Sequence, residues 1–66
     1  MVQKIIDIVG TSDKSFASAA DNAVAEAAKT VRELKWGRVS DMEVKIKGKE
    51  IAEYRVTLKI YFDVER

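Results

Sequence analysis

The sequence predicts an α+β fold whose elements follow the order strand, helix, strand, strand. Three observations predict this order: β-branched residues crowd positions 2–9, apolar residues recur at helical spacing over 16–34, and apolar and polar residues alternate over 51–64. No proline interrupts any of these segments. We therefore expect residues 1–66 to form a single domain.

The first strand is expected at residues 2–9, where it stops at a Gly-Thr-Ser turn signal. Ile5 and Ile6 are adjacent in this strand, so alternation does not show which face is buried. The Gly-Thr-Ser segment lacks the glycine spacing of a phosphate-binding loop, and we expect it to cap the following helix. The side-chain oxygens that can accept from the free amides of the first helical turn belong to Thr11, Ser12, Asp13 and Ser15.

A helix is expected to follow these candidate caps and to carry one apolar stripe whose first residue is Phe16. Spacings of three and four residues place the following side chains on that stripe: Phe16, Ala19, Ala20, Ala23, Val24, Ala27, Val31 and Leu34. Many of them are alanines, whose small side chains let a helix axis lie close to a sheet. A curved sheet is therefore expected to wrap this helix.

Two further strands are expected at 35–47 and 51–64, joined by a hairpin turn at 47–50 that contains Gly48. In the last strand, the even-numbered residues are apolar and are expected to pack on the helix. Residues 42, 44 and 46 (Met42, Val44 and Ile46) alternate with charged neighbours and are expected to face the helix as well.

Val39 has the wrong parity for that helix-facing set. A β-bulge near Ser40 and Asp41 would bring Val39 inward, because one extra residue reverses the side-chain register. Trp36, an odd number of residues from Val39, would then point outward. It would share the outer side of the sheet with Arg55.

Charge and composition exclude several classes of protein. Twelve basic and eleven acidic residues give a net charge of +1, far from the basic surplus of a nucleic-acid binder. No apolar run reaches the roughly 20 residues of a membrane span, and the N-terminus lacks the layout of a signal peptide. We therefore expect a soluble cytoplasmic protein with neither nucleic acid nor membrane as its partner.

Cysteine and histidine are both absent, which excludes disulfides and the common zinc and haem sites. No acidic segment has the dense spacing of a dedicated calcium loop, so no metal ligands are assigned. No lysine or carboxylate stands in a context that indicates catalysis, and we expect no enzyme. A core this small is usually supplemented by association with other copies.

Trp36, the only tryptophan, lies in a run of charged residues and has two interpretations. It is either an anchor at a subunit interface, where aromatic side chains are enriched, or a platform on which a flat aromatic ligand stacks. In a symmetric oligomer the two interpretations merge, since two copies of Trp36 facing each other across a two-fold axis would form a slot.

An ordered set of segments resembles the dodecin family over essentially the whole chain: VGTS at 9–12, SF at 15–16 with alanines after it, KTV at 29–31, Trp36, and YRVTLKIYF at 54–62. The resemblance implies a three-stranded antiparallel sheet, in the order 1-3-2, wrapped around one helix. It also implies a hollow homododecamer of cubic symmetry with flavin at the two-fold axes, where two flavins stack between symmetry-related tryptophans. Trp36 matches that tryptophan.

The chain departs from the family pattern at Arg55, which stands where a glutamine hydrogen-bonds the flavin edge. Glutamine both donates and accepts, whereas a guanidinium only donates. Arg55 would instead donate to flavin carbonyls, stabilise an anionic flavin or stack beside the ring. Members with arginine here and no tryptophan resemble calcium-associated dodecins without flavin, so the chain combines features of two branches.

Asp41 and Lys45 are further candidates on the outer side, where they would meet a ribityl chain or phosphate. The commoner role of such residues is a solvated or interface charge. Arg38 is, with Lys45, a candidate for the phosphate of FMN or FAD, whereas riboflavin carries none. The resemblance thus favours a flavin storage or buffering protein, and the alternative is a dodecin-like assembly protein that binds no flavin and is associated with calcium.

Overall fold

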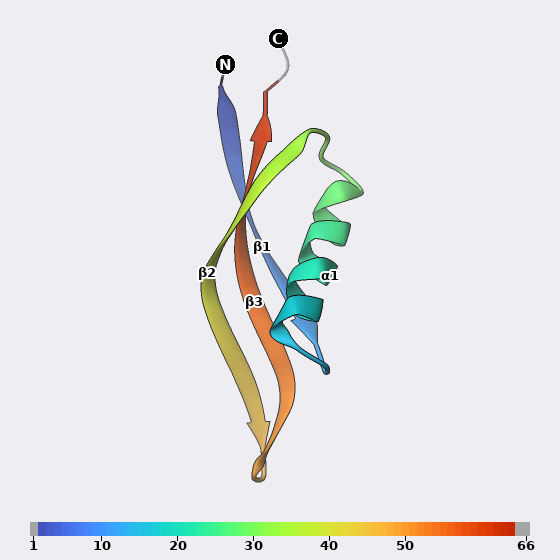
Figure 1. The fold of residues 1–66 in the computed structure, drawn as a ribbon, viewed down its shortest axis with the longest axis vertical. Coiled ribbons are helices and arrows are strands. Elements are labelled where there is room, and N and C mark those ends of the chain that lie inside the picture. The colour runs from blue at the N-terminus through green and yellow to red at the C-terminus, as the bar shows by residue number, and fades with distance from the viewer. Residues whose placement is uncertain (1, 65–66) are drawn as a thin grey trace.

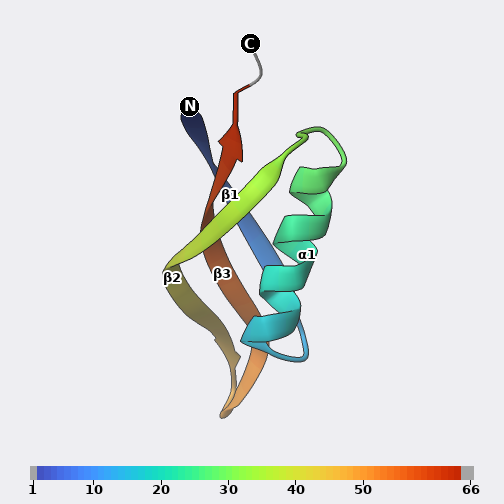
Figure 2. The ribbon, with the colours of Figure 1, turned by 45° about the horizontal axis from the view of Figure 1, so that its top comes forward.

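The structure, a computed structural model, describes residues 2–64 and has the predicted order of elements (Figure 1). The elements are β1 (Gln3–Ser12), α1 (Phe16–Ala28), β2 (Leu34–Lys47) and β3 (Glu50–Asp63). The strands form one antiparallel sheet in the order β1-β3-β2, as the resemblance implied. This sheet is strongly twisted and carries α1 on one of its faces (Figure 2).

Gly10 lies inside β1, which corrects the prediction that the strand stops before Gly-Thr-Ser and that this segment caps the helix. It pairs with Val56 of β3 and is buried under α1. A Cβ atom at this position would overlap the carbonyl oxygen of Ala19 and lie 2.8 Å from the Cβ atom of Ala23. Glycine is required because the helix backbone passes directly over the strand.

The helix begins at Phe16, and of the four candidate caps Ser15 is the N-cap, whose hydroxyl accepts from the Ser18 amide at 3.0 Å. It ends at Ala28, well short of the predicted end at Leu34. Glu33 adopts a left-handed conformation with a φ of 61°, which turns the chain back toward the sheet. Pairing with β3 then outweighs helical spacing for the residues that follow.

The core is a single layer between α1 and the centre of the sheet. The alanine stripe and the even-numbered residues of β3 meet there, as predicted, and the buried side chains are Ala19, Ala23, Ala27, Val56, Leu58 and Ile60. A core of this size gives one chain little stability by itself. None of the residues 2–64 forms a helix long and apolar enough to cross a membrane.

The predicted bulge in β2 is confirmed, since the register shifts between Val39 and Asp41. Val39 pairs with the buried Leu58, whereas Asp41 pairs with Thr57 of the opposite parity. The predicted hairpin turn is also confirmed, with Gly48 at a φ of 66°. One extra residue therefore lets both halves of β2 turn apolar side chains to the helix side.

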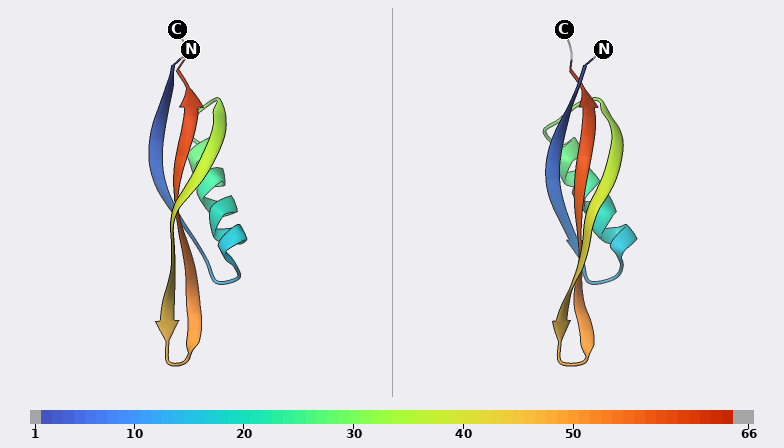
Figure 3. Two further views of the ribbon diagram at one scale, coloured as in Figure 1. Left: turned by 60° about the vertical axis from the view of Figure 1, so that its left-hand side comes forward. Right: turned by 90° about the vertical axis from the view of Figure 1, so that its left-hand side faces the viewer.

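The β2–β3 hairpin extends beyond the start of α1 (Figure 3). Phe16, the first residue of the helix, packs edge-to-face on Tyr54 with ring centroids 5.1 Å apart. Met42 and Val44 lie on the helix side but are 56% and 38% exposed, and Ile46 is 67% exposed. Met42 and Val44 thus face the helix side, as predicted, but the helix does not extend far enough along the hairpin to bury these three side chains.

Candidate functional site

All four candidate site residues lie on the side of the sheet turned away from α1, which we call the outer face. The odd-numbered residues of β3 from 53 to 63 point there, because the even-numbered ones are buried under the helix. Paired residues of antiparallel strands project to the same side. Trp36, Asp41 and Lys45 pair with Tyr61, Thr57 and Glu53, so all three join Arg55 on the outer face.

Trp36 is 71% exposed, the most exposed large apolar side chain among residues 2–64. Tyr61 pairs with Trp36 on one side and with Ile5 of β1 on the other, so an isoleucine, a tyrosine and a tryptophan form one row across the sheet. Ile5 is itself 50% exposed. The outward orientation of Trp36 is confirmed, and it stands at the end of an apolar row.

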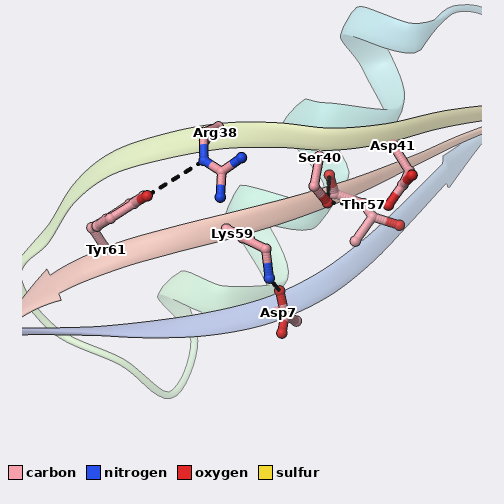
Figure 4. A network of polar contacts seen from close by, with 7 residues as sticks. All are labelled: Asp7, Arg38, Ser40, Asp41, Thr57, Lys59 and Tyr61. Carbon is pink, nitrogen blue, oxygen red and sulfur yellow. Dashed lines mark hydrogen bonds and ion pairs between the residues drawn. The ribbon is translucent and has the colours of Figure 1, made fainter.

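Charged groups surround this row. Arg38 Nε donates to Tyr61 Oη at 3.4 Å, and Lys59 Nζ donates to Asp7 Oδ1 at 2.8 Å (Figure 4). Beside Trp36 in the chain, Lys35 lies 3.1 Å from the Glu33 carboxylate. That hydrogen bond and charge raise the pKa of Lys35 above its ordinary value of 10.5, so the ammonium is fully charged at neutral pH.

Arg55 and Lys45 lie together at a different part of the outer face, near the hairpin. They line a shallow pocket of about 260 Å³ with Glu43 and Val44. Arg55 also forms an ion pair with Glu53 at 3.6 Å, which is weak because both groups are solvent-exposed. This pocket holds two of the predicted site residues without Trp36.

Trp36 and Arg55 are far apart in one chain. Tyr61, the partner of Trp36, is six residues from Arg55 along β3, which at the rise of an extended strand is about 20 Å. Asp41 lies between them at the bulge, where its carboxylate accepts from the Ser40 hydroxyl at 3.3 Å. The fold therefore brings Arg55 to Lys45 but not to Trp36.

Sequence reasoning missed the row formed by Ile5, Tyr61 and Trp36. The parity of Tyr61 placed it on the outer side, but only the strand register shows which residues it meets. It also missed a groove of about 220 Å³ at the β2 edge of the sheet, whose lining includes Trp36 and Gly37 of β2 and Val24 of α1. No three carboxylates within residues 2–64 are close enough to hold a metal ion.

Comparison with known proteins identifies the family. The family model described as Dodecin matches residues 2–65. The chain belongs to the dodecin family. Dodecin of Thermus thermophilus is 36% identical over 64 residues, which cover 97% of this chain and 93% of that protein. The dodecin family comprises small flavin-binding proteins that assemble as dodecamers, and self-assembly is thereby supported for this member.

Two further dodecins show the range of the family. The structure of dodecin from Streptomyces coelicolor matches with a TM-score of 0.94 at 32% identity, covering 98% of this chain and 93% of that one. Calcium dodecin of Mycobacterium tuberculosis is 34% identical over 61 residues, or 92% of this chain and 86% of that protein. The crystal structure of that protein is described as that of a calcium-chelating antigen with a novel calcium-binding site. It matches with a TM-score of 0.84 at 33% identity, covering 98% of this chain and 93% of that one.

Proposed function

We propose that this dodecin stores and buffers flavin in the cytoplasm, as a hollow dodecamer whose flavins stack on Trp36 at two-fold axes. The observation that carries the proposal is the exposure of Trp36, at 71%, on the outer face of the sheet. An indole in that position exposes a large apolar surface to water unless a ring or another subunit covers it. Binding is proposed and not catalysis, because the chain has no histidine or cysteine.

Two copies complete the proposed site. A single flavin ring is much shorter than the roughly 20 Å of strand that separates Trp36 from Arg55 in one chain. If both residues contact one flavin, Arg55 must therefore come from the second copy. A two-fold axis supplies this arrangement twice, since each copy gives its Trp36 to one site and its Arg55 to the other.

Replacement of Trp36 tests the proposal. Trp36→Ala should weaken riboflavin binding by about 1–3 kcal/mol, the range measured for bases that stack on aromatic side chains. Titration of riboflavin into each protein, followed by the quenching of flavin emission, gives the midpoint. Met42→Ala is the matched control, because it removes an exposed apolar side chain from the helix side of the sheet. An unchanged midpoint for Trp36→Ala would reduce Trp36 to an interface residue.

The role of Arg55 is tested by restoring glutamine. Arg55→Gln should tighten riboflavin binding by about 1–2 kcal/mol, if one neutral hydrogen bond and one unpaired polar group are at stake. The loss of the exposed ion pair with Glu53 costs little by comparison. Equal or weaker binding by the variant would show that the guanidinium makes a productive contact of its own.

The second candidate function is an assembly without flavin that binds calcium. It is favoured by Arg55 and by the 34% identity to calcium dodecin. Calorimetric titration with calcium chloride and, separately, with riboflavin distinguishes the two candidates. Heat of binding with calcium and none with riboflavin would replace the flavin proposal with this one.

A further inference from the structure

Arg38 is the outer-face residue that follows Trp36 on the same strand. It lies two residues further along β2, which places the two side chains about 7 Å apart at their bases, and it pairs with Lys59 of β3. Its Nε donates to the Tyr61 hydroxyl at 3.4 Å, so the guanidinium is held beside the row formed by Ile5, Tyr61 and Trp36 (Figure 4). The planar fork is thus positioned at the edge of the surface on which a flavin ring would stack.

Other cations near this row are already paired with carboxylates. Lys59 contacts Asp7 at 2.8 Å and Lys35 contacts Glu33 at 3.1 Å. Arg38 is within ion-pair distance of no carboxylate of residues 2–64, Asp41 included. Tyr61 occupies only one of the five N–H donors of the guanidinium, and the two terminal nitrogens remain available.

A free guanidinium fork beside an aromatic platform suits a ligand that joins a flat ring to a phosphate. Arginine binds phosphate through two parallel hydrogen bonds, which are stronger than neutral ones because both partners are charged. Flavin mononucleotide differs from riboflavin only by the phosphate at the end of its ribityl chain. Asp7, which lies across Lys59 from Arg38, is neutralised by its ion pair with Lys59 and does not repel that phosphate.

We propose that Arg38 binds the phosphate of flavin mononucleotide and makes this protein select the mononucleotide over riboflavin. The inference rests on the proposed stacking of flavin on Trp36, but it concerns a group that riboflavin lacks. The contribution of the shared ring cancels in the ratio of the two dissociation constants. That ratio therefore reports on the phosphate alone.

The experiment measures the dissociation constants of the mononucleotide and of riboflavin for wild type and for Arg38→Gln. Wild type should bind the mononucleotide about tenfold more tightly, the lower end of what a charge-assisted hydrogen bond gives at an exposed site. Arg38→Gln should reduce the ratio to about one, because it weakens binding of the mononucleotide more than binding of riboflavin. The wild-type preference should also decrease as sodium chloride is raised, because salt screens the phosphate from the guanidinium.

Arg32→Gln is the matched control. It removes the same group and the same charge from the helix side of the sheet, where Arg32 and Lys4 line a pocket with Phe62. This variant should keep the tenfold ratio. Arg38→Lys should give an intermediate ratio, because an ammonium retains the charge without the fork, and light scattering checks that each variant keeps the wild-type mass.

The outcomes separate the two proposals. Riboflavin binding with equal affinity for the mononucleotide, or a ratio that Arg38→Gln leaves unchanged, would overturn the role of Arg38 and leave the flavin proposal intact. An equal loss of ratio in Arg32→Gln would show a general effect of net charge and would also overturn it. Failure of both ligands to bind wild type would overturn the flavin proposal and this inference together.

Discussion

Replacing Gly10 with alanine adds one methyl group at the closest approach of α1 to the sheet. The new Cβ atom would overlap the carbonyl oxygen of Ala19 and lie 2.9 Å from the amide nitrogen of Ala23. Both are backbone atoms of the helix, so no side-chain rotation relieves the contact. The whole helix has to move outward, which separates its buried alanines from the β3 side chains beneath them.

The cost follows from the size of the core. Overpacking of a core costs about 1–3 kcal/mol where side chains can adjust, and we expect about 3 kcal/mol or more here because the backbone must move. For a domain of this length each kcal/mol shifts the melting temperature by roughly 4–8 °C. Gly10→Ala should therefore melt roughly 12–24 °C below wild type, or fail to assemble.

Gly37→Ala is the matched control, because it makes the same chemical change in another strand of the sheet. A Cβ atom at Gly37 would have Leu58 Cδ2 at 3.8 Å as its nearest neighbour, an ordinary van der Waals contact. Its melting temperature should stay within a few degrees of wild type, since one exposed methyl group changes stability by less than about 1 kcal/mol. Thermal unfolding by circular dichroism, at one protein concentration for all variants, measures both shifts.

Melting of Gly10→Ala within a few degrees of Gly37→Ala would contradict the requirement for glycine at position 10. That result would mean that the helix moves away from β1 at little cost. It would also mean that the alanine stripe does not fix the distance between the two layers.

Two further substitutions test the start of the helix and the loop that follows it. Ser15→Ala should lower the free energy of unfolding by about 1 kcal/mol, because the Ser18 amide loses its cap. Ser18→Ala removes a hydroxyl inside the helix but keeps the hydrogen bond from its backbone amide to Ser15, so it should not lower the free energy of unfolding. Chemical denaturation measures both. Glu33→Gly should raise the free energy of unfolding by about 1 kcal/mol, because glycine adopts a φ of 61° without strain. Glu33→Gln removes the ion pair with Lys35 and keeps the strained backbone, so it should give no gain. An equal gain in Glu33→Gln would contradict the role of the backbone.

Much of this fold follows from periodicity in the sequence. The alternation in β3 identified its buried face, and the parity of Val39 located the bulge in β2 and the outward orientation of Trp36. These predictions succeed because each depends on a period of two residues along one strand. The start of α1 was predictable to within a few residues for a similar local reason, since a cap lies directly before its helix and the four candidates, Ser15 among them, fall within 11–15.

Predictions that depend on contacts between distant segments failed. Gly10 was read as part of a turn because only the position of Ala19 and Ala23 shows why a strand residue has no side chain there. The end of α1 was placed too late because Leu34 fits helical spacing equally well, and its pairing with Phe62 decides the matter.

The candidate site was predictable as a set of residues on one face, but not as an arrangement. Parity placed Trp36 and Arg55 on the same side, and it carries no information on their separation along the sheet. The register shows that they lie about 20 Å apart and that Arg38, not Arg55, is the arginine beside Trp36.

The irregular register of β2 bears on how this chain avoids aggregation. β2 is an edge strand, and its pairing with β3 shifts between Leu34 and Trp36, between Val39 and Asp41, and between Lys45 and Ile46. At the first two shifts one extra residue stands in β2, which bends the strand and interrupts the regular spacing of its outward amides and carbonyls, whereas at the third the extra residue, Ala52, stands in β3. An added strand from another copy would find no uninterrupted template along this edge, which hinders open-ended, fibril-like stacking. Association of copies is thereby directed to the faces of the sheet, where contacts can close on themselves.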